Sequence, residues 1–327
     1  MTVKEKIITL FEQNNELSVK EITDTLLVSK QMVHIALNSL MAENKVVKYG
    51  KTPKTVYRFS EKPHPEFKND FNISDASNTF LDEHFLVITE IGEMLEGIKG
   101  FDYWCNKRNL PLRKTIDEYI LTQKKYDAYK DKDGFINGLD KLKSTKGMDQ
   151  IWLDELYYLD FYAIERFGKT RLGTILHYAK QGQNKMLMRI MIDEIRDKVE
   201  RFIKIHHIDA AGFVPPTIRR EVQVMKVLQA GLKINLPLIN ILKTSGIIPV
   251  PQKSLNKLEE RINNANNTFM LRSNQSFKRL LLIDDAVGSG ATLNQIAAKI
   301  KKSKVAEHIT GLAIVGSFKG FDVITDV

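Results

Sequence analysis

The sequence is poor in cysteine and in long apolar runs. Its 327 residues include a single cysteine, Cys105, which excludes a framework of disulfides and a zinc site built from cysteines. No apolar run reaches the roughly 18–20 residues that a membrane-spanning helix requires. The start of the chain is charged and amphipathic, unlike a signal peptide. We therefore expect a cytoplasmic protein that makes no contact with a membrane.

Acidic residues are also scarce relative to basic ones. The chain has 40 Asp and Glu residues against 49 Lys and Arg residues, which leaves a net charge of +9. Such a surplus indicates an anionic partner: a nucleic acid, a nucleotide or a phosphosugar. The length predicts two or three domains, and a hydrophobic fraction of 43% is ample for packed cores. The positions of the basic residues decide which partner is meant.

The first sixty residues have the pattern of a small helical domain. Apolar periodicity predicts helices at 3–13, at about 18–27 and at 29–44, followed by two strands at 45–49 and 55–59. The second helix begins with a capping box, in which Ser18 precedes Glu21 by three residues. Three helices followed by a two-stranded ribbon resemble a winged helix-turn-helix domain, which we place at residues 1–62.

The third helix and the ribbon carry the residues that would contact DNA. Five polar side chains near the start of the helix are expected to face outward: Ser29, Lys30, Gln31, His34 and Asn38. Such side chains contact base edges and phosphates in the major groove. The ribbon has Lys51 and Lys54 near its tip, which suits a neighbouring phosphate backbone. Double-stranded DNA is the expected partner, and regulators of this kind usually bind as homodimers over two half-sites. The alternative is a winged helix used for protein–protein contact.

The middle of the chain predicts a linker and a helical segment. Residues 63–79 are rich in Pro, Asn, Asp and Ser, which is typical of a domain boundary. Residues 80–154 predict a helical connector. One apolar stripe within it comprises Ile88, Ile91, Met94, Leu95 and Ile98. Phe101 and Trp104 are expected to lie in a core.

The most informative stretch is residues 280–294. A continuous apolar run at 280–283 predicts a strand buried on both faces of a parallel sheet. Asp284 and Asp285 close this strand and suit the hydroxyls of a ribose. A loop rich in Gly and Ser then leads into a helix from about 293 to 302, and a helix N-terminus behind glycines favours a phosphate. The residues expected to bind this phosphate are Val287, Gly288, Ser289, Gly290, Ala291 and Thr292. The sequence thus predicts a site for ribose 5-phosphate.

These residues resemble the phosphoribosyl-pyrophosphate (PRPP) motif of type I phosphoribosyltransferases. The resemblance implies an α/β domain at residues 155–327, with a parallel sheet and flanking helices. It further implies that Asp284 and Asp285 are catalytic residues that hold the ribose or a metal ion, and that Mg²⁺ is bound through the diphosphate of PRPP.

Upstream segments extend the resemblance to the ComF-like branch of that family. Residues 162–185 resemble its opening segment, and a strand predicted at 208–214 leads into the position of its pyrophosphate loop. The resemblance implies that this loop binds diphosphate through four residues: Pro216, Thr217, Arg219 and Arg220. Residues 252–269 match the branch's mobile loop, and the match implies that Arg261 closes over the diphosphate as a further catalytic residue.

The chain also departs from that branch. Glu221 stands where the branch has Gly, and Gln223 stands where it has Asn. The carboxylate of Glu221 beside the pyrophosphate loop weakens the expectation of diphosphate binding. The branch's cysteine zinc ribbon is absent, and the predicted winged helix occupies that end of the chain.

Three functions follow from the two resemblances. The first, which we favour, is a transcriptional regulator whose DNA-binding domain responds to PRPP or a nucleotide, because a fused sensor can couple a ligand to DNA affinity. The second is an active phosphoribosyltransferase, in which a nitrogen nucleophile displaces pyrophosphate from the ribose. The third is a ComF-like factor in DNA uptake or defence.

Overall fold

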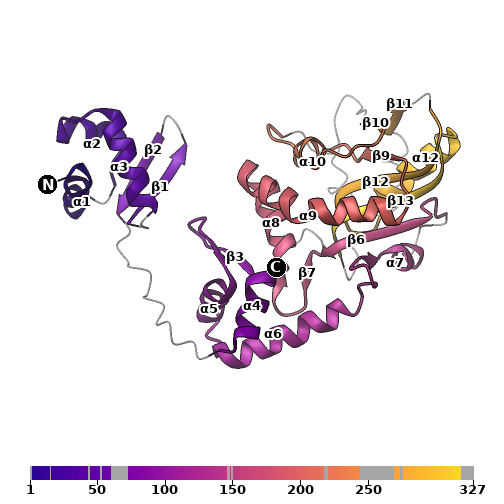
Figure 1. The fold of residues 1–327 in the computed structure, drawn as a ribbon, viewed down its shortest axis with the longest axis horizontal. Coiled ribbons are helices and arrows are strands. Elements are labelled where there is room, and N and C mark those ends of the chain that lie inside the picture. The colour runs from indigo at the N-terminus through magenta and orange to yellow at the C-terminus, as the bar shows by residue number, and fades with distance from the viewer. Residues whose placement is uncertain are drawn as a thin grey trace. The chain divides into compact units, whose positions relative to one another are not determined.

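The chain forms two compact units. The computed structural model describes residues 2–14, 16–42, 45–51, 54–59, 73–145, 148, 150–216, 220–243, 269–272 and 275–317. The units divide between Asn72 and Ile73 (Figure 1). We call residues 1–72 unit 1 and residues 73–327 unit 2. Each has a hydrophobic core of its own.

Unit 1 consists of three helices followed by a two-stranded ribbon. The helices are α1 (Val3–Gln13), α2 (Val19–Leu26) and α3 (Lys30–Ala42). Capping boxes begin α1 and α2: the side chains of Thr2 and Ser18 accept hydrogen bonds from the backbone N–H groups of Glu5 and Glu21, and the backbone N–H groups of Thr2 and Ser18 donate to the carboxylates of those glutamates. The capping box predicted at Ser18 is confirmed.

The ribbon is tied to the helices by backbone and by core. It pairs β1 (Val46–Lys51) with β2 (Lys54–Phe59) in antiparallel register, which places the backbones of Lys51 and Lys54 opposite each other. Leu17, between α1 and α2, exchanges two backbone hydrogen bonds with Tyr57, of 2.8 and 2.7 Å. Fully buried apolar side chains from all three helices form the core: Ile7, Ile22, Val33, Leu37 and Leu40.

The start of unit 2 differs from the sequence-based prediction. The helix α4 (Asp75–His84) begins inside the range predicted as linker, because the side chain of Ser74 caps it by accepting a hydrogen bond from the backbone of Ser77 at 3.2 Å. The apolar stripe predicted as a helix over 88–98 is wrong. Ile88, Ile91, Met94 and Leu95 belong to a hairpin of β3 (Leu86–Ile88) and β4 (Met94–Glu96), and Ile98 lies in the helix that follows. Gly92 makes the turn possible, since its φ of +82° is a conformation that other residues rarely adopt.

The rest of the predicted connector packs as part of unit 2. It contains α5 (Gly97–Asn106), α6 (Leu112–Asp127) and α7 (Leu139–Lys143). Phe101 and Trp104 are buried, as expected for core residues. The segment also supplies a short strand, β5 (Ile136–Asn137), which pairs with the central sheet of the unit.

The described residues of unit 2 form a seven-stranded sheet. Besides β5 it contains β6 (Glu155–Phe161), β9 (Ala210–Phe213), β10 (Leu238–Lys243), β11 (Phe269–Arg272), β12 (Phe277–Val287) and β13 (Ala306–Gly316), in the order β11-β10-β9-β12-β13-β6-β5. The five inner strands are parallel, and both edge strands are antiparallel. Unit 2 therefore has the mixed α/β fold with a mostly parallel sheet that the sequence predicts. A separate small hairpin pairs β7 (Ala163–Ile164) with β8 (Gly168–Lys169).

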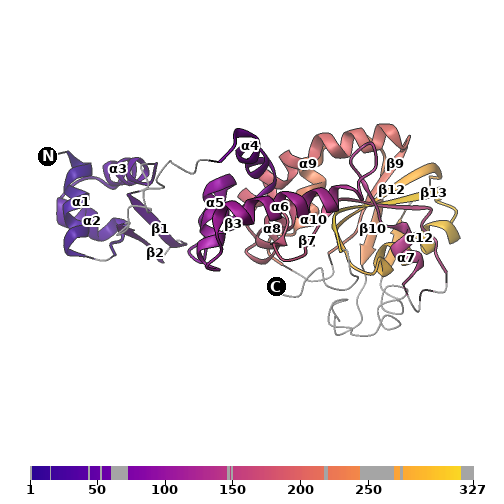
Figure 2. The same ribbon diagram turned by 90° about the horizontal axis from the view of Figure 1, so that it is seen from below.

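Helices cover both faces of this sheet. The helices α8 (Arg171–Gln181), α9 (Lys185–Ile205) and α10 (Val224–Leu232) share a core with Leu281 and Ile283 of β12. On the other face, α7 and α12 (Ala291–Lys302) share a core with Leu280 and Leu282. Figure 2 shows the strands between α9 on one side and α7 and α12 on the other. Burial on both faces explains why residues 280–283 are all apolar.

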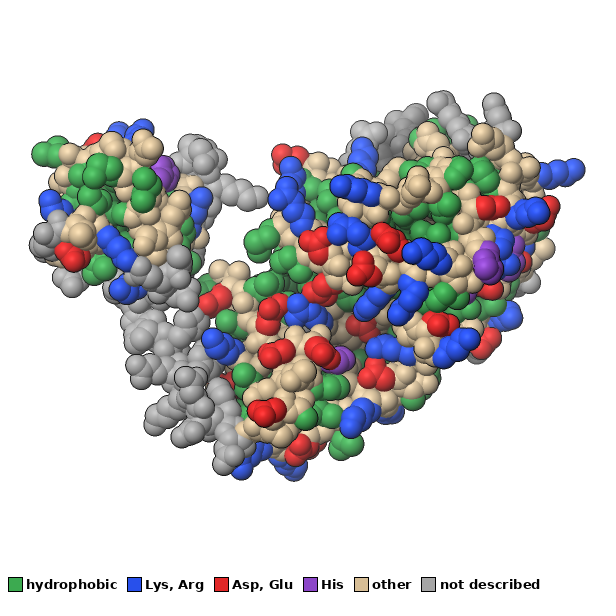
Figure 3. Space-filling view, in the orientation of Figure 1, with side chains coloured by type: hydrophobic (Ala, Val, Ile, Leu, Met, Phe, Trp, Pro, Cys, Tyr) green, Lys and Arg blue, Asp and Glu red, His purple; other side chains and the backbone are tan. Residues whose placement is uncertain are grey.

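Charged side chains of both signs are interspersed over the face of unit 2 seen in Figure 3. The net positive charge of the chain therefore does not single out a ligand site on this face. The carboxyl ends of the parallel strands are a better place to look, because ligands of open α/β sheets bind there.

Candidate functional site

The course of the chain changes direction between β9 and β12, which are neighbours in the sheet. After β9 the chain passes through α10 to β10 on one side, and after β12 it passes through α12 to β13 on the other. Open α/β sheets bind ligands at a switch point of this kind, outside the carboxyl ends of the two strands, and we call this place the crevice. The loops that follow β9 and β12 border this crevice. They are the loops predicted to bind diphosphate and ribose 5-phosphate.

The two acidic residues of the motif were expected to close the strand, but both lie inside β12. The strand pairs with β9 up to Ile283 but with β13 up to Val287, so Asp284 and Asp285 extend past the end of β9. Asp285 is 7% exposed, whereas Asp284 is partly exposed and accepts a hydrogen bond from the backbone of Asp285 at 2.8 Å. Neighbouring residues of a strand point to opposite faces. The two carboxylates therefore have different surroundings.

The loop at 288–290 ends in a helix N-terminus whose N-cap residue offers no side chain, and the N–H of Ala291 donates to Oγ of Ser289 at a long 3.4 Å. Gly290 occupies the N-cap position of α12 with a φ of +76°. The first N–H groups of a helix have no partner within it, and the helix dipole favours an anion at this end. Ser289 and Thr292 lie beside these groups and are partly exposed. The stretch predicted to bind phosphate thus spans the last residue of β12, the loop at 288–290 and the first residues of α12.

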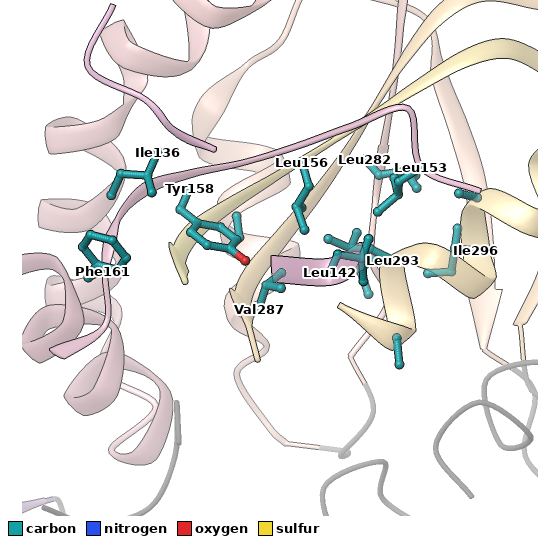
Figure 4. Close-up of a cluster of buried hydrophobic side chains, with 14 of the residues drawn as sticks. Ile136, Leu142, Leu153, Leu156, Tyr158, Phe161, Leu282, Val287, Leu293 and Ile296 are labelled. Carbon is teal, nitrogen blue, oxygen red and sulfur yellow. The ribbon is translucent and has the colours of Figure 1, made fainter. Parts of the chain in front are cut away.

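The loop packs directly against the core of unit 2. A Cβ atom at Gly290 would lie 2.7 Å from Cδ1 of Leu142 in α7. Figure 4 shows Leu142 beside Leu293 of α12, with Val287 of β12 close by. The segment predicted as a connector therefore packs against the glycine loop through Leu142 of α7.

Asn294 fixes the start of α12 to the chain that enters β6. Its side chain is fully buried. The Oδ1 atom accepts hydrogen bonds from the backbones of Trp152 and Leu153 at 2.6 and 3.3 Å, and Nδ2 donates to the carbonyl of Gln150 at 2.8 Å. This asparagine was not predicted as a site residue, because its partners lie more than 140 positions away in the sequence.

Lys180 joins the site from the far end of α8. Its Nζ atom lies 2.5 Å from Oδ2 of Asp285, and the two side chains are 27% and 11% exposed. A basic residue at the end of a helix is normally explained by the helix dipole. The contact with Asp285 spans 105 positions of sequence, and nothing in the local pattern predicts it.

Arg220 approaches the same turn from the loop after β9. Its guanidinium donates to the carbonyl of Lys180 and, at 3.3 Å, to the side chain of Gln181. Of the other residues predicted around the diphosphate, Pro216 is partly buried just after β9. Thr217, Arg219 and Arg261 lie outside the described residues. The structure therefore brings Arg220 and Lys180 to the crevice and gives Arg220 partners within the protein.

The residues predicted to contact DNA are exposed where they are described. These are Ser29, Lys30, Gln31, His34 and Asn38. Gln31, His34 and Asn38 recur at the spacing of one helix face, and Ile35 lies among them with 63% of its surface exposed. Ile35 was not predicted, because an isoleucine on an amphipathic helix is normally a core residue. The side chains of Lys51 and Lys54 are outside the described set.

The comparisons with known proteins add little to the geometry. No protein-family model matches the sequence, and no curated protein matches it. Among solved structures, the chain is similar to a hypoxanthine phosphoribosyltransferase from Staphylococcus aureus, with 17% identity and a TM-score of 0.22. The similarity covers 37% of this chain and 62% of that enzyme, so it spans less than two thirds of the enzyme's length. This is a weak structural likeness to a phosphoribosyltransferase.

The structure also bears on metals and membranes. Within the described ranges, no group of three or more His, Cys, Asp or Glu residues could hold a metal ion. Magnesium does not need such a group, since it is usually held by one or two carboxylates together with phosphate oxygens of a ligand. The partly exposed Asp284 at the crevice fits that requirement. None of the helices that the structure describes is long and apolar enough to cross a membrane.

Proposed function

We propose that unit 2 binds PRPP or a related nucleotide, and that unit 1 is a winged helix that binds double-stranded DNA in response. One observation carries the proposal. At the switch point, a glycine loop leads into a helix N-terminus whose N-cap residue is Gly290, beside the partly exposed carboxylate of Asp284. The helix N-terminus favours a phosphate group. A carboxylate at this position suits ribose hydroxyls, so a ribose 5-phosphate is the ligand that uses both.

The same carboxylate is the residue that would hold Mg²⁺ in company with a diphosphate. Bound there, the ion would neutralise charge on the diphosphate oxygens. The protein's own contribution is to place the helix N-terminus and Asp284 on one side of the crevice, and the turn that follows α8 on the other.

The proposal for unit 1 is supported by an exposed face and by a paired ribbon. Gln31, His34 and Asn38 offer amide and imidazole groups for base edges, and Ile35 offers an apolar contact such as a thymine methyl group requires. The ribbon places two lysine positions opposite each other at its tip. Binding as a homodimer to a site with two-fold symmetry is the expected mode.

Calorimetry of the full chain with PRPP and Mg²⁺ tests the ligand. We expect saturable binding by the native chain, and binding at least tenfold weaker by Asp284→Asn, since charged hydrogen bonds contribute about 1.5–3 kcal/mol. Asn106→Ala, on the exposed face of α5, is the control and should bind as the native chain does. Native binding of PRPP by Asp284→Asn would show that the site is placed wrongly.

A gel-shift assay with a random duplex library, followed by sequencing of the bound fraction, tests the regulator. We expect an enriched motif whose affinity changes when PRPP is added. An affinity that stays constant over the millimolar range of PRPP would remove the regulatory part of the proposal.

Catalysis is the second candidate, because the same loop would serve an active phosphoribosyltransferase. In that case a nucleobase or another nitrogen nucleophile releases pyrophosphate from PRPP. Measurement of pyrophosphate with a panel of bases separates the two candidates: release with any base favours an enzyme, and binding of PRPP without release favours a sensor.

A further inference from the structure

The turn that ends α8 lies beside the crevice and contacts two of its segments. We define the α8 turn as residues 180–183. It is joined to β12 through Lys180 and Asp285, at 2.5 Å. It is joined to the loop after β9 through Arg220, as described above, and through the side chain of Gln183, which accepts a hydrogen bond from the backbone of Val222 at 2.8 Å. The turn therefore contacts the end of β12 and the loop after β9.

Arg220 and Lys180, the two basic residues at this turn, differ in how many of their donors have partners within the described structure. The guanidinium of Arg220 donates to the carbonyl of Lys180 and to the side chain of Gln181. The guanidinium thereby caps the carboxyl end of α8. The ammonium of Lys180 has three N–H donors, and the described structure gives it the carboxylate of Asp285 as its acceptor. Two donors of Lys180 can therefore reach a ligand while the third stays on Asp285.

The position of this ammonium matches the part of the ligand that the helix N-terminus does not serve. The N-terminus of α12 lies after the end of β12, where a 5-phosphate would bind. Lys180 approaches β12 from α8, beside the loop that follows β9. A phosphosugar that filled the crevice would present its second anionic group on this side, next to Lys180.

We propose that Lys180 binds the diphosphate of the ligand, and that Asp285 acts as a positioning residue that orients its ammonium. This inference rests on the proposed function of unit 2. It assigns the diphosphate to a residue outside both predicted phosphate loops, and it gives the two acids separate tasks. Asp284 faces the ribose or Mg²⁺, and Asp285 holds Lys180.

The test uses calorimetry of the full chain with three probes in the presence of Mg²⁺: inorganic pyrophosphate, ribose 5-phosphate and PRPP. Lys180→Met should weaken the binding of pyrophosphate and PRPP about tenfold or more, because it removes a charged hydrogen bond to the diphosphate. It should change the binding of ribose 5-phosphate less than about twofold, because that probe uses the N-terminus of α12. Lys180→Arg should restore part of the pyrophosphate affinity, since it keeps the charge.

Lys185→Met is the matched control, because it removes the same charge at the exposed start of α9. It should leave all three affinities unchanged. An equal loss for ribose 5-phosphate and pyrophosphate in Lys180→Met would mean that Lys180 only maintains the shape of the site, and an unchanged pyrophosphate affinity would mean that it does not contact the ligand. Either result overturns the inference. A native chain that binds none of the probes overturns the proposed function itself.

Folding of each variant is checked by tryptophan fluorescence, since both tryptophans, Trp104 and Trp152, lie in unit 2. If Lys180→Met does not fold, Lys180→Gln keeps a polar side chain near Asp285 and removes the charge. It should show the same loss of pyrophosphate affinity and the same unchanged affinity for ribose 5-phosphate. A loss of ribose 5-phosphate affinity with unchanged pyrophosphate affinity would contradict the role given to Lys180.

Discussion

The two units carry their candidate functional residues in opposite ways. In unit 1, Gln31, His34 and Asn38 are exposed on one face of α3, while Val33 and Leu37 of the same helix fill the core. In unit 2, the residues that shape the crevice are part of the packing itself. Gly290 rests on Leu142, and Asn294 is fully buried.

This difference teaches where stability and binding can be separated. A helix displays one face and buries another, so its exposed face can change at little cost in folding free energy. In the crevice, by contrast, residues such as Gly290 and Asn294 are also neighbours of the core. We therefore expect substitutions of the buried residues of the crevice to alter the stability of unit 2, and substitutions on the exposed face of α3 to leave that of unit 1 unchanged.

The largest effect is expected at Gly290. Gly290→Ala should destabilise unit 2 by about 3 kcal/mol, because it adds the cost of a positive φ to a contact with Leu142 that is too short. Urea unfolding followed by tryptophan fluorescence measures it. Gly92→Ala is the matched control, since Gly92 has a φ of +82° with no atom within 4 Å of the added Cβ. It should cost only about 1–2 kcal/mol. Equal losses would show that Leu142 does not support the loop.

Asn294→Ala should follow, with a loss of about 2–3 kcal/mol. The substitution leaves the backbone groups of residues 150, 152 and 153 without their side-chain partner, and the N–H of Leu153 is buried, where an unsatisfied group is costly. The same unfolding measurement reports it, and the emission of Trp152 should change before the main transition. Asn106→Ala on the surface of α5 should stay within about 0.5 kcal/mol of the native chain. A similar small loss at Asn294 would remove it from the support of α12.

The sequence predicts the features of unit 2 that depend on neighbouring residues. The strand, the glycine loop and the helix at 280–302 follow one another without interruption, so composition alone indicates them. The contact between Lys180 and Asp285 depends instead on the order of strands in the sheet. Since α8 and β12 are far apart in sequence, no local pattern could show that they meet.

Periodicity also failed where two structures share one spacing. Ile88 and Met94 are opposite each other in a hairpin, yet their separation of six residues also fits a stripe with Ile91, Leu95 and Ile98 on a helix. Gly92 was the signal that distinguishes the two, because a glycine between short apolar runs is typical of a turn. By contrast, the helices of unit 1 have clear caps, and their starts lie within a residue of the prediction.

The two acids offer a smaller contrast within the crevice. Asp285→Asn should destabilise unit 2 by about 1–2 kcal/mol, since it leaves a partly buried Lys180 without its counter-charge, and the partial exposure of that pair reduces the full cost. Asp284→Asn should cost about 0.5 kcal/mol or less, because that carboxylate is partly exposed. Urea unfolding of both variants at pH 7 compares them. Equal losses of stability would mean that Asp284 and Asp285 do not have the separate roles proposed for them.

The smallest effect on stability is expected on α3, where the effect on binding should be large. Changing Gln31, His34 and Asn38 together to Ala removes exposed side chains and introduces the residue with the best helix propensity. The free energy of unfolding of unit 1 should change by less than about 0.5 kcal/mol per residue, whereas Val33→Ala should lower it by about 2 kcal/mol, because it leaves a cavity.

Unit 1 has no tryptophan. Its unfolding is therefore measured as a loss of helical circular dichroism that occurs without a change in tryptophan fluorescence. DNA affinity should fall in the triple variant and should survive in Asp24→Ala with Thr25→Ala on exposed α2. If both surface variants keep full affinity, the face of α3 is a protein contact, and the contrast between the units is one of stability alone.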